Sequence, residues 1–199
     1  MALDRLKSDV LWVQIPPVPF FFFLRQIIFM KITIVQLGKI PESVLTAIAS
    51  ELRDSLELST ETTNPIEIPK EILNPIRQQY PAPLVLKFLS EKFKGKTLGV
   101  TDKDLYAENL NFVFGQAYCP GNYAVVSIHR LDPTFYKQKP NENLLIERAV
   151  KEAMHEVGHM LGLDHCTIST CVMSFSNTVG DVDRKSKNFC QSCQRKIWV

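Results

Sequence analysis

The feature that most constrains this chain is the run His-Glu-Val-Gly-His-Met-Leu-Gly-Leu-Asp-His at residues 155–165. On a helix, His155 and His159 lie one turn apart and project from the same face. Two imidazoles placed in this way can bind one Zn²⁺ at about 2.0–2.1 Å each. Glu156 lies about 100° around the helix from His155, too far to be a natural third ligand. It can instead accept a proton from a metal-activated water.

Gly162 permits a sharp turn behind this helix, so His165 can return to the same ion. Three neutral nitrogen ligands then leave a fourth position open, which is typical of a catalytic zinc site. The alternative interpretation is that these histidines are ordinary surface or core residues on a helix, and the added glycine and third histidine argue against it. His129, alone at the end of a predicted strand, is interpreted as structural or surface.

Four of the five cysteines follow this run, in C-x₄-C and C-x₂-C spacing. They are Cys166, Cys171, Cys190 and Cys193. Each pair can chelate, and four thiolates can close a tetrahedral structural zinc site. Such a site would hold a C-terminal stretch that has little hydrophobic periodicity of its own. The alternative is a redox pair or free thiols, although no thioredoxin-like pattern surrounds them. Cys119 stands apart and is predicted to be a small turn or core residue.

Composition predicts a globular chain with a core and excludes some partners. Of the 199 residues, 45% are hydrophobic and 22% charged, with a net charge of +2. These values argue against general disorder. The sequence lacks the basic stripe of a nucleic-acid-binding protein, and the Arg-Lys-Ser-Lys run at 184–187 is interpreted as solvated surface. We therefore expect neither a nucleic-acid nor a membrane partner. We also expect the protein to be a monomer.

Residues 1–29 precede the first well-patterned strand. Prolines on one side and Arg25 with Gln26 on the other interrupt the apolar run at 20–23. We therefore predict neither a membrane-spanning helix nor a signal peptide there. We interpret 1–29 as a non-native or disordered extension, with translation starting at Met30. Without an export signal the predicted compartment is the cytoplasm, where cysteines stay reduced.

Hydrophobic periodicity predicts an α+β fold, in which helices pack on a mixed twisted sheet. The predicted strands cover residues 31–38, 66–68, 97–101, 111–117 and 123–129, the last two forming a hairpin across 119–122. The predicted helices cover 41–58, a stretch from Arg77 or Pro83 to Phe93, a long helix from Asn141 or Asn143 to Gly162, and 189–198. Two or three helices on the sheet, a long active-site helix and a small irregular C-terminal subdomain are thus expected.

The pattern H-E-x-x-H-x-x-G-x-x-H-C-x₄-C-x-M, followed by C-x₂-C, resembles the archaemetzincin family of metzincin zinc metalloproteases. The resemblance implies a metzincin-like catalytic domain over 30–199, with an upper subdomain over 30–162 and a lower one over 163–199. It also implies two zinc ions per chain. The implied residues are His155, His159 and His165 on the catalytic zinc, Glu156 as general base, Met173 in the turn beneath the metal, and Cys166, Cys171, Cys190 and Cys193 on a structural zinc.

The implied function is a zinc-dependent metallopeptidase, of endopeptidase or aminopeptidase type, acting on peptide or protein substrates. A zinc-activated water would attack the peptide carbonyl, with Glu156 moving the proton. The substrate would lie extended along an edge strand, for which 111–117 is the candidate. Phe175 stands where some metzincins have a tyrosine that approaches the metal, so the sequence indicates no oxyanion stabiliser. The alternative is a non-catalytic, zinc-stabilised peptide-binding protein, and the retained Glu156 favours the enzyme.

Overall fold

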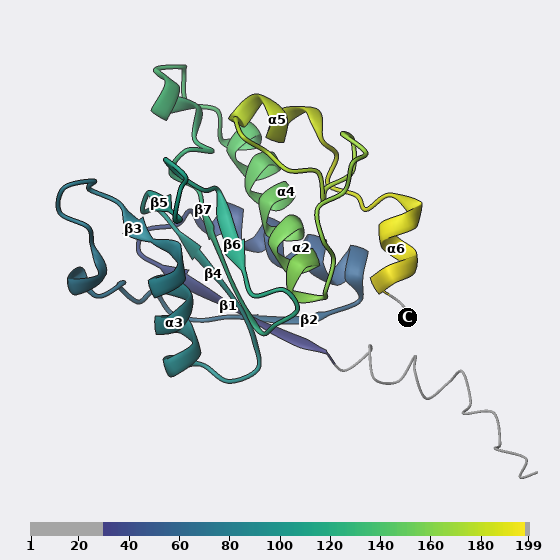
Figure 1. Ribbon diagram of the computed structural model, residues 1–199, viewed down its shortest axis with the longest axis horizontal. Coiled ribbons are helices and arrows are strands. Elements are labelled where there is room, and N and C mark those ends of the chain that lie inside the picture. Colours follow the sequence, from purple (N-terminus) through teal and green to yellow (C-terminus); the bar gives the residue numbers. More distant parts are fainter. Residues whose placement is uncertain (1–29, 198–199) are drawn as a thin grey trace, which may run out of the picture.

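The computed structural model describes residues 30–197, and its centre is a five-stranded mixed sheet in the order β2-β1-β4-β7-β6 (Figure 1). The first four of these strands run parallel, and β6 pairs antiparallel with β7 at one edge. A small second sheet pairs β3 with β5 in parallel. The strands are β1 (Lys31–Leu37), β2 (Ser59–Thr62), β3 (Tyr80–Pro81), β4 (Lys96–Thr101), β5 (Leu105–Tyr106), β6 (Gly115–Ala117) and β7 (Tyr123–Ser127).

Helices cover both faces of the sheet. Helices α2 (Glu42–Leu56) and α4 (Glu142–Met160) pack on one face, and α3 (Ala82–Lys92) packs on the other. Strand β1 shows why both faces are covered. Ile32 and Ile34 belong to the core under α2 and α4, while Val35 and Leu37 belong to the core under α3. A parallel strand inside the sheet buries both faces, and β1 accordingly places apolar residues on each of them.

Helix α4 has defined ends, which set where its last turn lies. The Asn141 side chain accepts a hydrogen bond from the backbone N–H of Leu144 at 3.1 Å and so caps the first turn. Gly162, at φ 93°, follows the last turn in the left-handed conformation that glycine adopts most easily. Lys96 Nζ donates to the carbonyl oxygens of Gly121 and Met160 at 2.9 and 3.3 Å. The end of α4 is thereby attached to the turn before β7.

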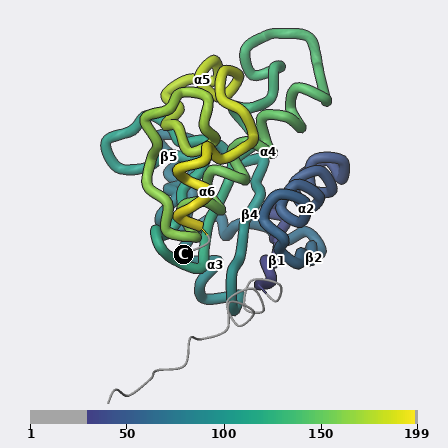
Figure 2. The backbone as a smooth tube through the Cα atoms, turned by 90° about the vertical axis from the view of Figure 1, so that its right-hand side faces the viewer, coloured from purple at the N-terminus to yellow at the C-terminus, as the bar shows by residue number. Residues whose placement is uncertain are grey.

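The C-terminal segment passes along α4 and encloses it. It contains α5 (Val179–Arg184) and α6 (Gln191–Ile197), drawn in yellow beside the green α4 in Figure 1 and seen from another side in Figure 2. A continuous run from Arg148 to Gly158 in α4 is therefore buried, including charged residues. Among residues 30–197, no helix combines the length and apolar character that a membrane span needs.

The α+β class, the mixed sheet and the long helix are confirmed, and the differences concern short elements. Strand β2 is not among the predicted strands, because Ser-Thr-Glu-Thr at the sheet edge has no apolar face. The predicted strand at 66–68 is reduced to a single bridge between Leu37 and Ile66. Helix α3 begins at Ala82, because Tyr80 and Pro81 are in β3. The predicted strand 111–117 pairs with β7 only at 115–117, since Val113 bridges to Leu105 instead.

Two further sequence predictions are not tested by this fold. The interpretation of 1–29 as a non-native or disordered extension concerns residues outside the described range. The division into an upper subdomain of 30–162 and a lower one of 163–199 stays a prediction.

Candidate metal centre

The three histidines of the 155–165 run meet at the C-terminal end of α4. Their ligand nitrogens lie within 4.8 Å of one another, and His155 Nε2 and His159 Nε2 are 3.1 Å apart. Two nitrogens bound to one tetrahedral zinc ion would be about 3.3 Å apart. His155 and His159 come from successive turns of the helix, and His165 returns after the turn at Gly162. The geometry therefore fits a single ion held by three imidazoles.

Backbone carbonyls orient two of these rings. The Nδ1 of His155 lies 2.8 Å from the carbonyl oxygen of Val172, and the Nδ1 of His159 lies 2.6 Å from that of Leu163. An Nδ1–H that donates to a carbonyl leaves Nε2 with its lone pair free for a metal. Burial lowers the pKa of all three histidines, most strongly for His155, where nearby Lys185 adds to the effect. The rings are therefore neutral at pH 7, the form that binds metal.

Glu156 lies beside the histidines with a buried carboxylate. Its Oε2 has no hydrogen-bond partner among the described residues. Burial, followed by the nearby Glu152 carboxylate, raises its pKa well above the usual range, while Lys185 opposes this. A Cβ added to Gly115 of β6 would lie 2.6 Å from Glu156 Cγ and Oε1. A glycine in the edge strand thus allows the carboxylate to lie directly against the strand.

Met173 is fully buried and packs against Gly158 of α4, the helix that carries His155 and His159. A Cβ on Gly158 would overlap its Sδ and lie 3.0 Å from Phe189 Cε1, so the glycine lets Met173 contact the helix backbone. The Met173 carbonyl accepts a hydrogen bond from the N–H of Cys166 at 2.9 Å, which joins the Met173 segment to the cysteine cluster. Phe175 packs near His165, with ring centroids 4.9 Å apart, and is 48% exposed.

The four C-terminal cysteines gather into a second cluster, with all sulfurs within 4.8 Å of one another. Cys166 Sγ is 3.8 Å from Cys190 Sγ, and Cys171 Sγ is 3.8 Å from Cys193 Sγ. Sulfurs at about 2.3 Å from a tetrahedral zinc would be about 3.8 Å apart, whereas a disulfide needs about 2.05 Å. The spacing therefore matches a thiolate metal site.

The remaining cysteine, Cys119, and the remaining histidine, His129, lie outside the two clusters. Cys119 is exposed in the turn before β7, and its Sγ lies 3.5 Å from the Leu163 carbonyl oxygen. His129 is half-buried, its ring centroid 5.2 Å from that of Phe135. Neither residue belongs to a metal-ligand group among the described residues.

A buried ion pair lies next to the metal centre, and the sequence did not indicate it. Lys185 Nζ is 2.9 Å from Glu152 Oε1, and both side chains are under 5% exposed. Nζ also lies 3.3 Å from the Ser174 carbonyl oxygen and 3.5 Å from His155 Nδ1. The interpretation of 184–187 as solvated surface is therefore wrong for Lys185. Nothing local in the chain distinguishes Lys185 from its exposed neighbours, because its partner is more than thirty residues away.

A cleft of about 450 Å³ opens over the histidines. Its lining combines polar groups of α4 with a largely apolar strip that leads into β6. Gln116 Oε1 and Ser176 Oγ are buried and have no hydrogen-bond partner among residues 30–197. The main lining residues are 109–117, Glu152, His155, Glu156, His159, His165 and 175–177.

Comparisons with known proteins agree with this geometry. Residues 30–198 match the model of peptidase family M54. The chain is 41% identical over 171 residues to the archaemetzincin of Methanocaldococcus jannaschii, covering 86% of this chain and 94% of that protein. It is 41% identical over 172 residues to the archaemetzincin of Saccharolobus solfataricus, covering 84% and 93%.

Solved structures of similar proteins also match this fold. The crystal structure of archaemetzincin from Methanopyrus kandleri superimposes with a TM-score of 0.77 at 41% identity, covering 85% of this chain and 94% of that one. A zinc-dependent peptidase from Methanocorpusculum labreanum superimposes with a TM-score of 0.74 at 31% identity, covering 83% and 99%.

Replacing Gly158 with alanine tests the contact between Met173 and α4. We expect a net loss of about 1–2 kcal/mol in the free energy of unfolding, because overpacking outweighs the better helix propensity of alanine. Urea denaturation measures it. Gly180→Ala is the control, because the nearest atom to its added Cβ is Thr178 Oγ1 at 3.6 Å. Equal stabilities of the two variants would contradict the close contact.

Replacing Lys185 with methionine tests the buried ion pair. We expect a loss of about 3–5 kcal/mol in the free energy of unfolding, because Glu152 is left as an unpaired buried charge. The double variant Lys185→Met/Glu152→Leu should recover most of this. The control is Lys187→Met, whose ammonium is half-exposed and 2.6 Å from Glu51 Oε2. A double variant no more stable than Lys185→Met would refute the pairing.

Proposed function

The chain belongs to peptidase family M54, the archaemetzincins, and is a zinc metallopeptidase, and we propose that His155, His159 and His165 hold its catalytic zinc. The observation that carries this proposal is the convergence of three neutral imidazoles beside a buried carboxylate. The hydrogen bonds from Nδ1 to Val172 and Leu163 support it, because they direct Nε2 of two rings toward one point. No fourth protein ligand belongs to this group among the described residues.

We propose Glu156 as the general base. A zinc ion held by the histidines supplies Lewis acidity, which polarises the scissile carbonyl and lowers the pKa of a water molecule. Glu156 takes a proton from the attacking water and later donates it to the leaving amine nitrogen. Burial raises its pKa above the usual range, which makes this carboxylate a stronger base than an exposed one and supports the role. The unpartnered Oε2 leaves an oxygen available for that proton.

The peptide substrate is proposed to lie along β6. This strand pairs with β7 on one side, and its residues Gly115–Ala117 line the cleft. An extended peptide can add to such an edge through main-chain hydrogen bonds. Gln116 Oε1 and Ser176 Oγ, both buried and without a hydrogen-bond partner in the described part of the chain, offer further polar contacts to the substrate.

We propose that the four cysteines hold a second, structural zinc. The backbone N–H of Cys193 lowers the pKa of the Cys190 thiol to about 7, which favours a thiolate there, whereas burial raises the pKa of Cys171 and Cys193. The spacing of the four sulfurs carries the proposal. Cys166 directly follows the ligand His165, and Cys171 lies two residues before Met173. A metal at this cluster would therefore anchor the segment that passes beneath the catalytic centre. The cytoplasmic location, which would keep these thiols reduced, stays a prediction.

Replacing Glu156 with glutamine tests the catalytic mechanism. Turnover of a mixed-sequence peptide library should fall by about 10²–10⁴-fold, because the amide cannot accept the proton. Zinc content, measured by inductively coupled plasma mass spectrometry, should not change. Glu147→Gln on the same helix is the control, since Glu147 is 60% exposed and pairs with Lys151 at 2.7 Å. Unchanged turnover in Glu156→Gln would refute the mechanism. Peptide binding without turnover in the wild type would favour a non-catalytic peptide-binding protein.

Replacing Cys171 with serine tests the second zinc. The wild-type protein should bind about two zinc ions per chain and the variant about one, because three thiolates leave the tetrahedral site incomplete. The thermal midpoint should fall with the lost ion. Cys119→Ser is the matched control and should keep both ions. Two ions in Cys171→Ser, or four thiols that react freely with a thiol reagent in the wild type, would contradict the site.

A further inference from the structure

One side of the cleft is formed by a segment of which only the last part belongs to a β-strand. We call residues 109–117, which line the cleft continuously, the wall segment. Its last three residues are β6, but the preceding six are irregular. Their backbone bonds include Leu110 N–H to the Ala107 carbonyl at 3.1 Å and Val113 N–H to the Leu105 carbonyl at 2.9 Å. Asn109 has φ 63°. Side chains from elsewhere must therefore complete the anchoring of this stretch.

Arg77 provides that anchor. Its Nη2 donates to the carbonyl oxygens of Leu110 and Asn111 at 3.2 and 2.8 Å. Its Nε donates to Gln79 Oε1 at 2.9 Å, and its guanidinium lies over the Tyr106 ring at 4.2 Å. The Arg77 side chain thus binds two consecutive carbonyls of the wall segment, and Gln79 and Tyr106 fix its own orientation.

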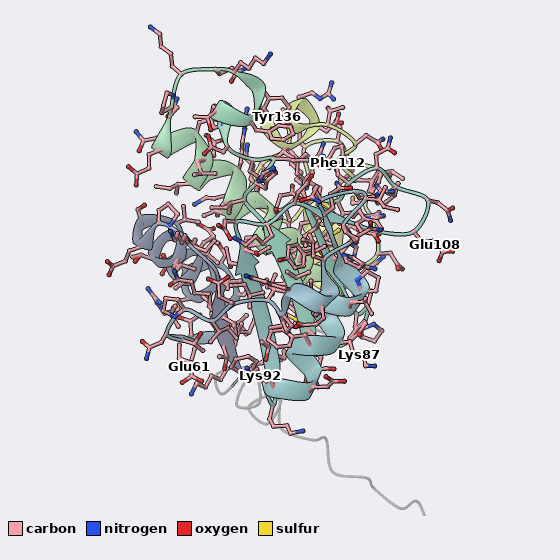
Figure 3. The ribbon with its side chains drawn as sticks, turned by 90° about the vertical axis from the view of Figure 1, so that its left-hand side faces the viewer. Glu61, Lys87, Lys92, Glu108, Phe112 and Tyr136 are labelled. Atoms are coloured by element: carbon pink, nitrogen blue, oxygen red, sulfur yellow. The ribbon has the colours of Figure 1, made fainter. Side chains whose placement is uncertain are left out.

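A second layer supports the same segment from beneath. Gln79 Nε2 donates to the Asn111 carbonyl at 3.0 Å and to Asp104 Oδ2 at 2.9 Å. Asp104 accepts two hydrogen bonds of 2.7 Å from Arg130, whose guanidinium lies 4.4 Å from the Phe112 ring centroid. In Figure 3 the loop carrying Glu108 extends outward from the body of the molecule, and Phe112 lies at its inner end.

We infer that Arg77 is a positioning residue for peptide binding, which rests on the proposed function of this cleft. Arg77 is not one of the lining residues, so it acts on substrate only through the carbonyls that it fixes. The side chain is exposed, and exposed residues outside the core contribute little to global stability. Its network of directed hydrogen bonds therefore serves the conformation of the wall segment, which a peptide would otherwise have to order on binding.

The geometry requires a guanidinium. Its planar fork donates through Nη2 and Nε at the same time, and its flat face stacks on Tyr106. A lysine ammonium carries the same charge but cannot reproduce the stacked, forked arrangement. Arg77→Lys therefore separates the positioning role from a simple effect of charge.

The experiment combines binding and turnover of one mixed-sequence library of short peptides. Binding is measured with full-length zinc-loaded protein in the Glu156→Gln background, as the dissociation constants of the peptides that this protein retains. Arg77→Met and Arg77→Lys are compared in that background and in the active protein. Arg53→Met is the matched control, because Arg53 lies on α2 and donates to Thr60 Oγ1 at 2.8 Å, away from the cleft.

We expect both Arg77 variants to raise Kd and KM by about tenfold, the effect of one to two lost charge-assisted hydrogen bonds. The kcat, zinc content and unfolding midpoint should not change, and Arg53→Met should match the unmodified protein. An unchanged Kd, a loss confined to kcat, full rescue by lysine, or no peptide retained at all would overturn the inference. Absence of turnover in the wild type, with the Kd pattern intact, would instead speak against the proposed peptidase mechanism alone.

Discussion

The metal centre depends on two hydrogen bonds between imidazole rings and main-chain carbonyls. His155 and His159 each place Nδ1 against a carbonyl oxygen, of Val172 and Leu163 respectively. Both carbonyls belong to the segment that follows α4, so the rings take their orientation only after that segment has folded back beside the helix. Side chains one turn apart on a helix can approach each other in many rotamers, and the carbonyls select one. Chain reversal at Gly162 is thus as necessary to the site as the histidines.

The segment that folds back contributes apolar residues such as Val172, Met173 and Val182 to the core, and polar contacts fix its position against α4. Lys185 joins α4 to the turn after Met173 through Glu152 and the Ser174 carbonyl. The cysteine cluster joins the residues after His165 to the start of α6. A buried ion pair adds little net stability compared with apolar packing. It does restrict the conformation of the segment, because any other conformation would leave a buried charge without its partner. This fits a segment that holds the carbonyls of Val172 and Leu163 against the imidazole rings.

The sequence predicted the parts of the site that follow from local spacing, and missed those that depend on tertiary contacts. Helical geometry brings His155 and His159 together whatever the rest of the chain does, so their proximity could be predicted. Glu152 carried a weaker signal, one turn before Glu156 on the same helix. Lys185 and Arg77 carried none, because an ion pair and a backbone contact more than thirty residues distant leave no periodic trace. Strand β2 was missed for another reason, because its four polar residues show no apolar face.

The most direct test of this account is a crystal structure of the zinc-loaded protein with anomalous data at the zinc absorption edge. The account predicts one zinc peak about 2.0–2.1 Å from Nε2 of His155 and His159 and from a ring nitrogen of His165, with solvent at the remaining position. It predicts a second peak among the four cysteine sulfurs. A fourth protein side chain closing the first site, or imidazole rings turned away from a shared ion, would contradict it.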